Sequence, residues 1–354
     1  MGTQPGPGRP ADGGWHGFHL VYHADRDALL TGVVAPLVGE LWQEGVLRRC
    51  FFVRYHLGGP HVRLRLELPS GAGTVVTERV RARTEEFFRL YPSTAPRPAE
   101  EIRRENRGIL AGDALAVERE DLVYPDNSVQ DAPVVFETER YGGPALLEHS
   151  LDFFTVSSAR ALSWLHVSAG QPAGARLAGA ARLLVRQAWG LAPDGAAFTE
   201  LAGSGVRLMG EVLPAFVARG DEAFERGGGS MERLVRHELD ALSAGDAGPD
   251  VLAAAALAGA IAGADEFRRW SIAASQLHMT ANRLGLLNPQ EVYLARMLWR
   301  AAEAAAAADP VWWRACWEAR ARWCPGVGAP LRRMALDSPG TLAGGTAPTA
   351  SAGT

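Results

Sequence analysis

The sequence predicts an α+β fold in which a ferredoxin-like antiparallel sheet layer in the N-terminal part is followed by a mainly helical C-terminal part. Two observations support this prediction. Strand-like and helix-like segments follow one another in the order β-α-β-β-α over residues 15–92, which is typical of a sheet with its helices on one face. After residue 144 the apolar residues recur largely at helical spacing.

The elements of the sheet layer can be assigned in order from their apolar periodicity. The segment WHGFHLVYH (15–23) alternates between apolar and polar residues and predicts the first strand. Residues 27–45 carry apolar residues at helical spacing, and Pro36 within them predicts a kink. The segment 51–69 has the pattern of a β-hairpin, and residues 74–92 have that of an amphipathic helix.

The pattern is weaker after this helix. Residues 93–118 are polar and charged, and predict an exposed helix or a mobile insertion. The segments ALAVERE (114–120) and PVVFETERY (133–141) predict two further strands, separated by the turn-rich YPDNSVQD. The helices expected after them cover residues 144–155, 157–167, 173–190, 207–218, 231–243, 250–263, 265–284, 288–307 and 310–323.

Length and composition are those of an ordinary globular protein, with 354 residues, 47% of them hydrophobic and 21% charged. We expect a single domain over residues 15–325, sheet-rich over 15–143 and helical over 144–325. The Gly- and Pro-rich residues 1–14 predict a disordered start, and residues 326–354 predict a flexible tail.

Composition also excludes several classes of function. The net charge of -4 gives no general nucleic-acid signal, and the absence of Lys excludes Schiff-base chemistry on a lysine. The three cysteines, Cys50, Cys316 and Cys324, form no CxxC motif, which argues against a disulfide framework or a structural metal site. The first residues lack the apolar core of a signal peptide, and no apolar stretch is long enough to span a membrane, so a cytoplasmic location is expected.

The hairpin is predicted to carry five basic side chains on one face: Arg54, His56, His61, Arg63 and Arg65. A two-residue turn at Gly58–Gly59 would pair Arg54 with Arg63 and His56 with His61. Like charges opposite one another destabilise a strand pair unless an anion lies between them, and Arg suits carboxylates and phosphates. The pattern predicts a site for an anionic group, with a solvated sheet face as the alternative.

A second chemically capable stretch is FETERYGG (136–143), with Glu137, Glu139, Arg140 and Tyr141 before a Gly pair. In a regular strand Glu137 and Glu139 share one face and Arg140 lies on the other, unless a bulge redirects it. The alternative is an ordinary strand end with exposed charges.

A third stretch, SQLHMTANRLGL (275–286), places His278 and Asn282 four residues apart on one helix face, beside Arg283. A histidine can transfer protons near neutral pH, although a lone His on a helix is more often structural. The fingerprints of zinc metalloproteases, α/β-hydrolases, P-loop NTPases and Rossmann enzymes are missing from the sequence.

Taken together and in this order, FFVRYHLGGPHVRLRL, ETERYGG and HMTANRLGL resemble the C-terminal elimination domain of lanthipeptide dehydratases. The same domain also occurs as the stand-alone thiopeptide-type bacteriocin biosynthesis protein. The resemblance extends over roughly residues 15–325. It implies that a separate tRNA-dependent subunit glutamylates Ser or Thr of a precursor peptide with a leader, and that this chain then eliminates glutamate to give dehydroalanine or dehydrobutyrine.

The residues implied by the resemblance to be catalytic are Arg63, Arg65, Glu137, Arg140 and His278. The chemistry agrees with their types, because removal of a Cα proton builds negative charge that fixed cations can stabilise. The arginines can hold the departing glutamate and His278 can transfer the proton; Glu137 can orient a neighbour or act as the base. Neither a cofactor nor a metal is required. Substrate-binding residues are expected at Arg54, His56, His61, Tyr141, Asn282 and Arg283.

Two alternatives remain open at this point. The same family includes pyridine synthases, which join two dehydroalanines in a formal [4+2] cyclisation with loss of the leader, and in which the elimination residues tend to be lost. Retention of those residues here favours elimination. The other alternative is a non-catalytic scaffold, whose basic hairpin would only hold an acidic leader peptide. Neither reading requires contact with a membrane or with nucleic acid.

Overall fold

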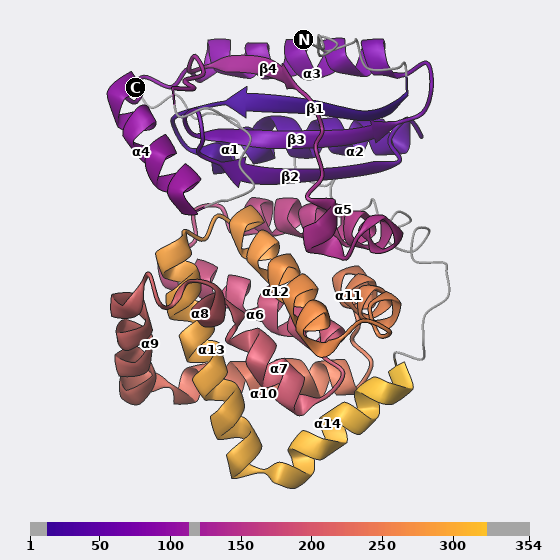
Figure 1. Ribbon diagram of the computed structural model, residues 1–354, viewed down its shortest axis with the longest axis vertical. Coiled ribbons are helices and arrows are strands. Elements are labelled where there is room, and N and C mark those ends of the chain that lie inside the picture. The colour runs from indigo at the N-terminus through magenta and orange to yellow at the C-terminus, as the bar shows by residue number, and fades with distance from the viewer. Residues whose placement is uncertain (1–12, 113–120, 324–354) are drawn as a thin grey trace, which may run out of the picture.

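The computed structural model describes residues 13–112 and 121–323, and confirms the α+β prediction (Figure 1). A four-stranded sheet with its helices forms one layer, and a larger helical part lies against one edge of this layer. Residues 1–12 of the predicted disordered start at 1–14, the predicted strand at 114–120 and the predicted tail at 326–354 lie outside the described residues.

The sheet is antiparallel, with strand order β2-β3-β1-β4. This order is the one that the β-α-β-β-α-β connection of a ferredoxin-like layer produces. The strands are β1 (Gly14–Val21), β2 (Arg49–Tyr55), β3 (His61–Leu68) and β4 (Ser128–Ala132). The prediction of a strand over residues 133–141 was wrong, because the strand lies in the preceding segment, which had been taken for a turn.

Helices cover one face of the sheet. They are α1 (Arg26–Leu29), a π-helical turn η1 (Leu30–Val34), α2 (Ala35–Gln43) and α3 (Gly73–Leu90) (Figure 1). The apolar residues that point toward these helices, Phe18, Leu20, Val62 and Leu64 among them, are 1% exposed or less. The opposite face of the sheet is crossed by the chain that runs from β4 to the helical part (Figure 1).

The predicted kink at Pro36 takes the form of the π-helical turn. Pro36 has no N–H to donate within the helix, so the regular hydrogen-bond pattern must change near it. The change precedes the proline, where the Ala35 N–H bonds to the carbonyl of Leu30, five residues back.

The helical part begins with one long helix, α5 (Pro144–Val167), where the sequence predicted two. Two further differences are α7 (Gly195–Ala202), which was not predicted, and the replacement of the helix expected at 207–218 by α8 (Ser204–Met209) and α9 (Pro214–Gly227). The remaining helices are α4 (Ala99–Gly112) beside the sheet, α6 (Ala173–Leu191), α10 (Gly229–Ser243), α11 (Pro249–Ala260), α12 (Glu266–Arg283), α13 (Asn288–Ala308) and α14 (Pro310–Trp323).

Candidate active site

The hairpin register differs by one residue from the prediction. Tyr55 pairs with His61 and Arg54 pairs with Val62, so Arg54 lies on the helix-covered face while Arg63 and Arg65 lie on the other. A slip of one residue moves every side chain to the opposite face, and the prediction that Arg54 shares a face with the other basic residues was wrong.

The reason for the different register is the length of the turn. Residues 56–60 all lie between the paired strands, and the Gly59 N–H bonds to the carbonyl of His56. Gly58 and Gly59 have φ angles of 87° and 107°, which suit glycine, but they form part of a longer loop. Asn106 of α4 holds this loop by accepting a hydrogen bond from the Gly58 N–H at 2.9 Å.

Arg63 is held in place by two aromatic side chains. Its guanidinium lies 3.5 Å from the centre of the Tyr55 ring, and its Nε donates to Nε2 of His61 at 3.4 Å. The Nδ1–H of His61 donates to the carbonyl of Gly59 at 2.8 Å, which leaves Nε2 as the acceptor. The orientation of Arg63 is therefore fixed before any ligand binds.

Arg65 lies buried next to Arg63 on the same face, and a glycine on the neighbouring strand makes room for it. A Cβ at Gly17 would lie 2.9 Å from Nη1 of Arg65 and 2.5 Å from the carbonyl oxygen of Ala132. Both contacts are closer than real Cβ atoms allow. Glycine at this position of β1 thus lets the Arg65 side chain approach the sheet.

His19 is a neighbour of this group that the sequence reasoning did not identify. It lies opposite Arg63 on β1, and its ring centre is 4.6 Å from that of His61. Burial, followed by repulsion from His61 and Arg63, lowers the pKa of His19 to about 2. Burial likewise lowers the pKa of His61 to about 3. Both imidazoles are neutral at physiological pH, so the positive charge here belongs to the arginines. We call Tyr55, His19, His61, Arg63 and Arg65 the sheet group.

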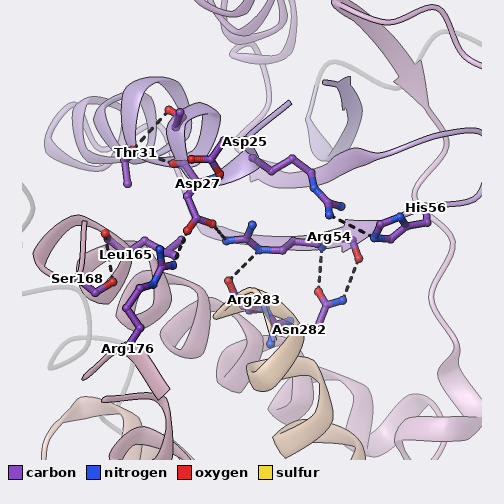
Figure 2. Close-up of polar contacts among 12 residues, drawn as sticks. Asp25, Asp27, Thr31, Arg54, His56, Leu165, Ser168, Arg176, Asn282 and Arg283 are labelled. Atoms are coloured by element: carbon purple, nitrogen blue, oxygen red, sulfur yellow. Dashed lines mark hydrogen bonds and ion pairs between the residues drawn. The ribbon is translucent and has the colours of Figure 1, made fainter. Parts of the chain in front are cut away.

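Arg54 and Asn282 join the sheet to the helical part (Figure 2). The Asn282 carboxamide accepts from the Arg54 N–H and donates to the Arg54 carbonyl, both at 2.9 Å, as a neighbouring strand would. The Arg54 side chain reaches Asp27 at 2.6 Å and the carbonyl of Arg283 at 3.2 Å. These contacts give both residues a structural role at the edge of β2.

Arg283 continues the same contact. It is fully buried, donates from Nε to the Phe52 carbonyl at 3.0 Å and from Nη1 to the Ser157 hydroxyl at 2.9 Å. His56, also predicted to bind substrate, lies 3.3 Å from Nη2 of Arg26 in the hairpin loop. Burial, then repulsion from Arg26, lowers the pKa of His56 to about 4.

Asp27 connects three elements in this region. Its carboxylate binds Arg54 of β2 and Arg176 of α6 (Figure 2). Burial acts to raise the pKa of Asp27, but the two guanidinium groups hold it below its usual value. Ion pairs of Asp27 therefore link helix α1 to the sheet and to the helical part, in addition to the hydrogen bonds between Asn282 and the Arg54 backbone.

The ETERY stretch forms a 3₁₀ turn, η2 (Thr138–Tyr141), and not a strand. In this turn Glu137 and Arg140 come together, with Nη1 of Arg140 2.8 Å from Oε2 of Glu137. The prediction that they face opposite ways was therefore wrong. Arg140 also donates from Nε to the Ser275 hydroxyl of α12 at 3.3 Å. Tyr141 is buried against Phe154, and burial raises its pKa to about 12.

His278 lies on a stripe of α12 that faces these elements. Ser275, three residues earlier, contacts Arg140, and Asn282, four residues later, contacts the edge of β2. Residues at this spacing share one side of a helix. The Nδ1 atom of His278 lies 2.9 Å from Oε2 of Glu291 on α13. Glu291 was missed as a site residue, because a carboxylate in the first turn of a helix gives no signal of a partner thirteen residues earlier. We call Glu137, Arg140, His278 and Glu291 the helix group.

A continuous set of aromatic rings connects the two groups. Phe51 is the cross-strand neighbour of Arg65, and its ring lies 5.3 Å from that of Phe154. The same Phe154 ring lies 5.0 Å, between ring centres, from the ring of Tyr141, the residue after Arg140. Phe136, directly before Glu137, packs on Trp15 at 5.4 Å. Phe154 thus contacts both the cross-strand neighbour of Arg65 and the residue next to Arg140.

The described residues contain neither a cluster of metal ligands nor a membrane-spanning helix. Within residues 13–112 and 121–323, no three His, Cys, Asp or Glu side chains gather closely enough to hold a metal ion. No helix of the same described ranges is long and apolar enough to cross a membrane.

Comparison with known proteins identifies the family to which a chain with this α+β fold belongs. The chain belongs to the lantibiotic biosynthesis dehydratase C-terminal family, whose model matches residues 15–302. A comparison with curated proteins found no match.

Three solved structures share the fold. TbtD, a pyridine synthase from thiomuracin biosynthesis, has a TM-score of 0.63 at 18% identity, over 84% of this chain and 100% of that chain. The tRNA-dependent lantibiotic dehydratase MibB from Microbispora sp. 107891 has a TM-score of 0.55 at 22% identity, and the match covers 85% of this chain and 28% of that chain. TsrL has a TM-score of 0.54 at 18% identity, and the match covers 89% of this chain and 99% of that chain. At these identities the superpositions establish the fold alone.

Proposed function

We propose that this chain is a glutamate eliminase of a split peptide dehydratase. It would convert glutamylated Ser or Thr of a ribosomally made precursor peptide into dehydroalanine or dehydrobutyrine. A separate tRNA-dependent subunit would install the glutamate. The reaction would take place in the cytoplasm and would use neither a cofactor nor a metal.

One observation carries the proposal: the two residue groups supply the two things that a β-elimination needs. The sheet group offers fixed guanidinium charge, because Arg63 is held by Tyr55 and His61 and Arg65 is accommodated by Gly17. The helix group offers a partly exposed imidazole paired with a buried carboxylate. Preorganised charge and positioned proton-transfer groups are the largest contributions to reactions of this type.

The chemistry proceeds by removal of one proton and one carboxylate. A base takes the proton from Cα, the electrons of the Cα–H bond form the Cα=Cβ double bond, and the Cβ–O bond breaks. Glutamate leaves with the electron pair of that bond as a carboxylate. Arg63, Arg65 and Arg140 stabilise the charge that develops on the neighbouring carbonyl and on the leaving group.

The direct test uses a synthetic peptide that carries a glutamyl ester on a single Ser, incubated with the full chain. Mass spectrometry should show loss of glutamate and formation of dehydroalanine. His278→Ala and Arg63→Ala should slow this loss strongly, to a low residual rate. Arg79→Ala, which removes an exposed arginine paired with Glu44 on the helical side of the sheet, is the matched control and should behave as wild type. An intact ester after prolonged incubation with wild type would exclude the proposal.

A second candidate is a pyridine synthase. It is favoured by the match to TbtD, which this chain covers over its whole length at the highest of the three TM-scores. A peptide in which two dehydroalanines are already present distinguishes the two functions. Formation of a six-membered nitrogen heterocycle with release of the leader would support cyclisation, and recovery of unchanged peptide would count against it.

A further inference from the structure

The contact between His278 and Glu291 suggests how the proton-transfer group is controlled. We propose that Glu291 is the positioning residue of His278: its carboxylate fixes the proton on Nδ1 and leaves Nε2 as the atom that accepts a proton from substrate. This inference rests on the proposed elimination and assigns the base, which sequence reasoning left open between His278 and Glu137.

The pairing is created by the corner between α12 and α13. Gly285 follows α12 with a φ angle of 83°, and the Leu286 N–H bonds to the carbonyl of Ala281 at 3.0 Å. This is the glycine-terminated end that stops a helix and reverses the chain. The reversal brings Glu291, thirteen residues after His278, within 2.9 Å of its Nδ1.

Glu291 is rigidly enclosed. Its side chain is only 7% exposed, and a Cβ added to Gly205 of α8 would lie 3.2 Å from its Cγ. A buried carboxylate is costly unless it receives hydrogen bonds, and His278 Nδ1 lies 2.9 Å and 3.1 Å from its two oxygens. Since a carboxylate can only accept, Nδ1 carries the hydrogen.

The two side chains of the pair differ in their exposure to solvent. The His278 side chain is 24% exposed while that of Glu291 is 7%, so the pair is open to solvent through the imidazole. With Nδ1 occupied, Nε2 is the free nitrogen. When Nε2 takes the Cα proton, the ring becomes an imidazolium, and the adjacent carboxylate stabilises that charge. Other charges near this stripe of α12 include Arg140, bound to Ser275, and Glu137, bound to Arg140. Arg54 lies at the end of the stripe, where it contacts Asn282 and the carbonyl of Arg283.

The first measurement is independent of activity. Nitrogen-15 NMR of the full chain should show His278 protonated at Nδ1 and not at Nε2 near neutral pH. In Glu291→Leu the usual preference of free histidine for the Nε2–H form should return. Wild type found in the Nε2–H form would overturn the proposal. If the tautomer is as stated but the glutamyl ester is never eliminated, the proposed function fails and the positioning of His278 stands.

The second measurement is a double-mutant cycle on elimination. Glu291→Gln should lower kcat about 10- to 100-fold with little change in KM, and move the acid limb of the pH–rate profile, because the charge next to the imidazole is lost. Combined with His278→Ala, Glu291→Gln should cost nothing further. Glu303→Gln, on the exposed side of α13, is the matched control and should be silent. An additive loss in the double variant would show that Glu291 acts independently of His278, and would overturn the proposal.

Discussion

The sheet group and the helix group differ in how the fold holds them. In the sheet group His19, His61 and Arg65 are buried, and Tyr55 and Arg63 are partly exposed. Arg63 and Arg65 take their directions from strand register, from an aromatic ring and from a glycine. In the helix group the two basic side chains, Arg140 at 36% and His278 at 24% exposed, are each paired with a carboxylate, from Glu137 and Glu291 respectively. Under the proposed function, this difference indicates a division of tasks. The sheet group would provide fixed positive charge, and the helix group would provide the side chains that transfer protons.

The largest effect should come from the sheet group. Arg65→Ala removes a guanidinium that is fixed before substrate arrives, so elimination should slow by about 100- to 1000-fold, as for loss of one preorganised donor. Rates are to be measured on glutamylated peptide, with folding checked by thermal unfolding. Arg81→Ala, which breaks an ion pair with Asp131 elsewhere in this layer, should change the rate little. Equal rates for wild type and Arg65→Ala would remove the sheet group from the reaction.

The next effect separates structure from chemistry at Asn282. Asn282→Ala leaves the N–H and carbonyl of Arg54 without their partner at the edge of β2. The free energy of unfolding should fall by about 2 kcal/mol, because buried backbone groups lose their hydrogen bonds. Chemical denaturation measures this change. The elimination rate per folded molecule should fall far less than in His278→Ala, and an equal fall would place Asn282 in the chemistry.

The third effect is a pH dependence of stability. His19 has a pKa of about 2 in the fold, far below the value of about 6.5 in an unfolded chain. Between these values the unfolded chain binds more protons, so stability falls as pH falls. Wild type should lose about 2 kcal/mol more than His19→Phe between about pH 6.5 and about pH 5.

Urea unfolding at several pH values measures this difference. His237→Gln, whose imidazole is 71% exposed, provides the comparison and should follow wild type. If His19→Phe shows the same pH dependence as wild type, burial does not keep His19 neutral in the fold.

The smallest effect should come from Ser275. Ser275→Ala removes the hydroxyl that accepts from Nε of Arg140, while Glu137 still holds Nη1. One weak hydrogen bond is worth about 1 kcal/mol, so a fall of about fivefold or less in kcat is expected. Steady-state kinetics tests this, and a fall as large as that of His278→Ala would mean that Ser275 contacts the substrate.

Much of the fold was predictable because the patterns that define it are local. The alternation in β1, the spacing in α12 and the β-α-β-β-α order all follow from periodicity within a single segment. The hairpin register was not predictable in this way. It depends on Asn106 and Tyr124, from distant parts of the chain, which hold Gly58 in a loop longer than two residues.

The site was predictable only where a resemblance named its residues. Arg63, Arg65, Glu137, Arg140 and His278 came from motifs, and their roles remain predictions. Glu291 and His19 had no local signal, since one resembles a helix-start carboxylate and the other a strand histidine. For Asn282 and Arg283 the binding role remains a prediction. Their contacts with β2 could not be predicted, because polar groups that replace a neighbouring strand cannot be distinguished by sequence from groups that bind a ligand.

The pairing of Asn282 with Arg54 has a consequence for how a peptide could enter. Asn282 follows His278 by four residues on the same helix, so the two residues are separated by a rise of about 6 Å along the helix axis. The helical part cannot swing away from the sheet without breaking these backbone hydrogen bonds and the ion pairs of Asp27. Under the proposed function, a peptide substrate would therefore have to reach His278 without separation of the sheet from the helical part.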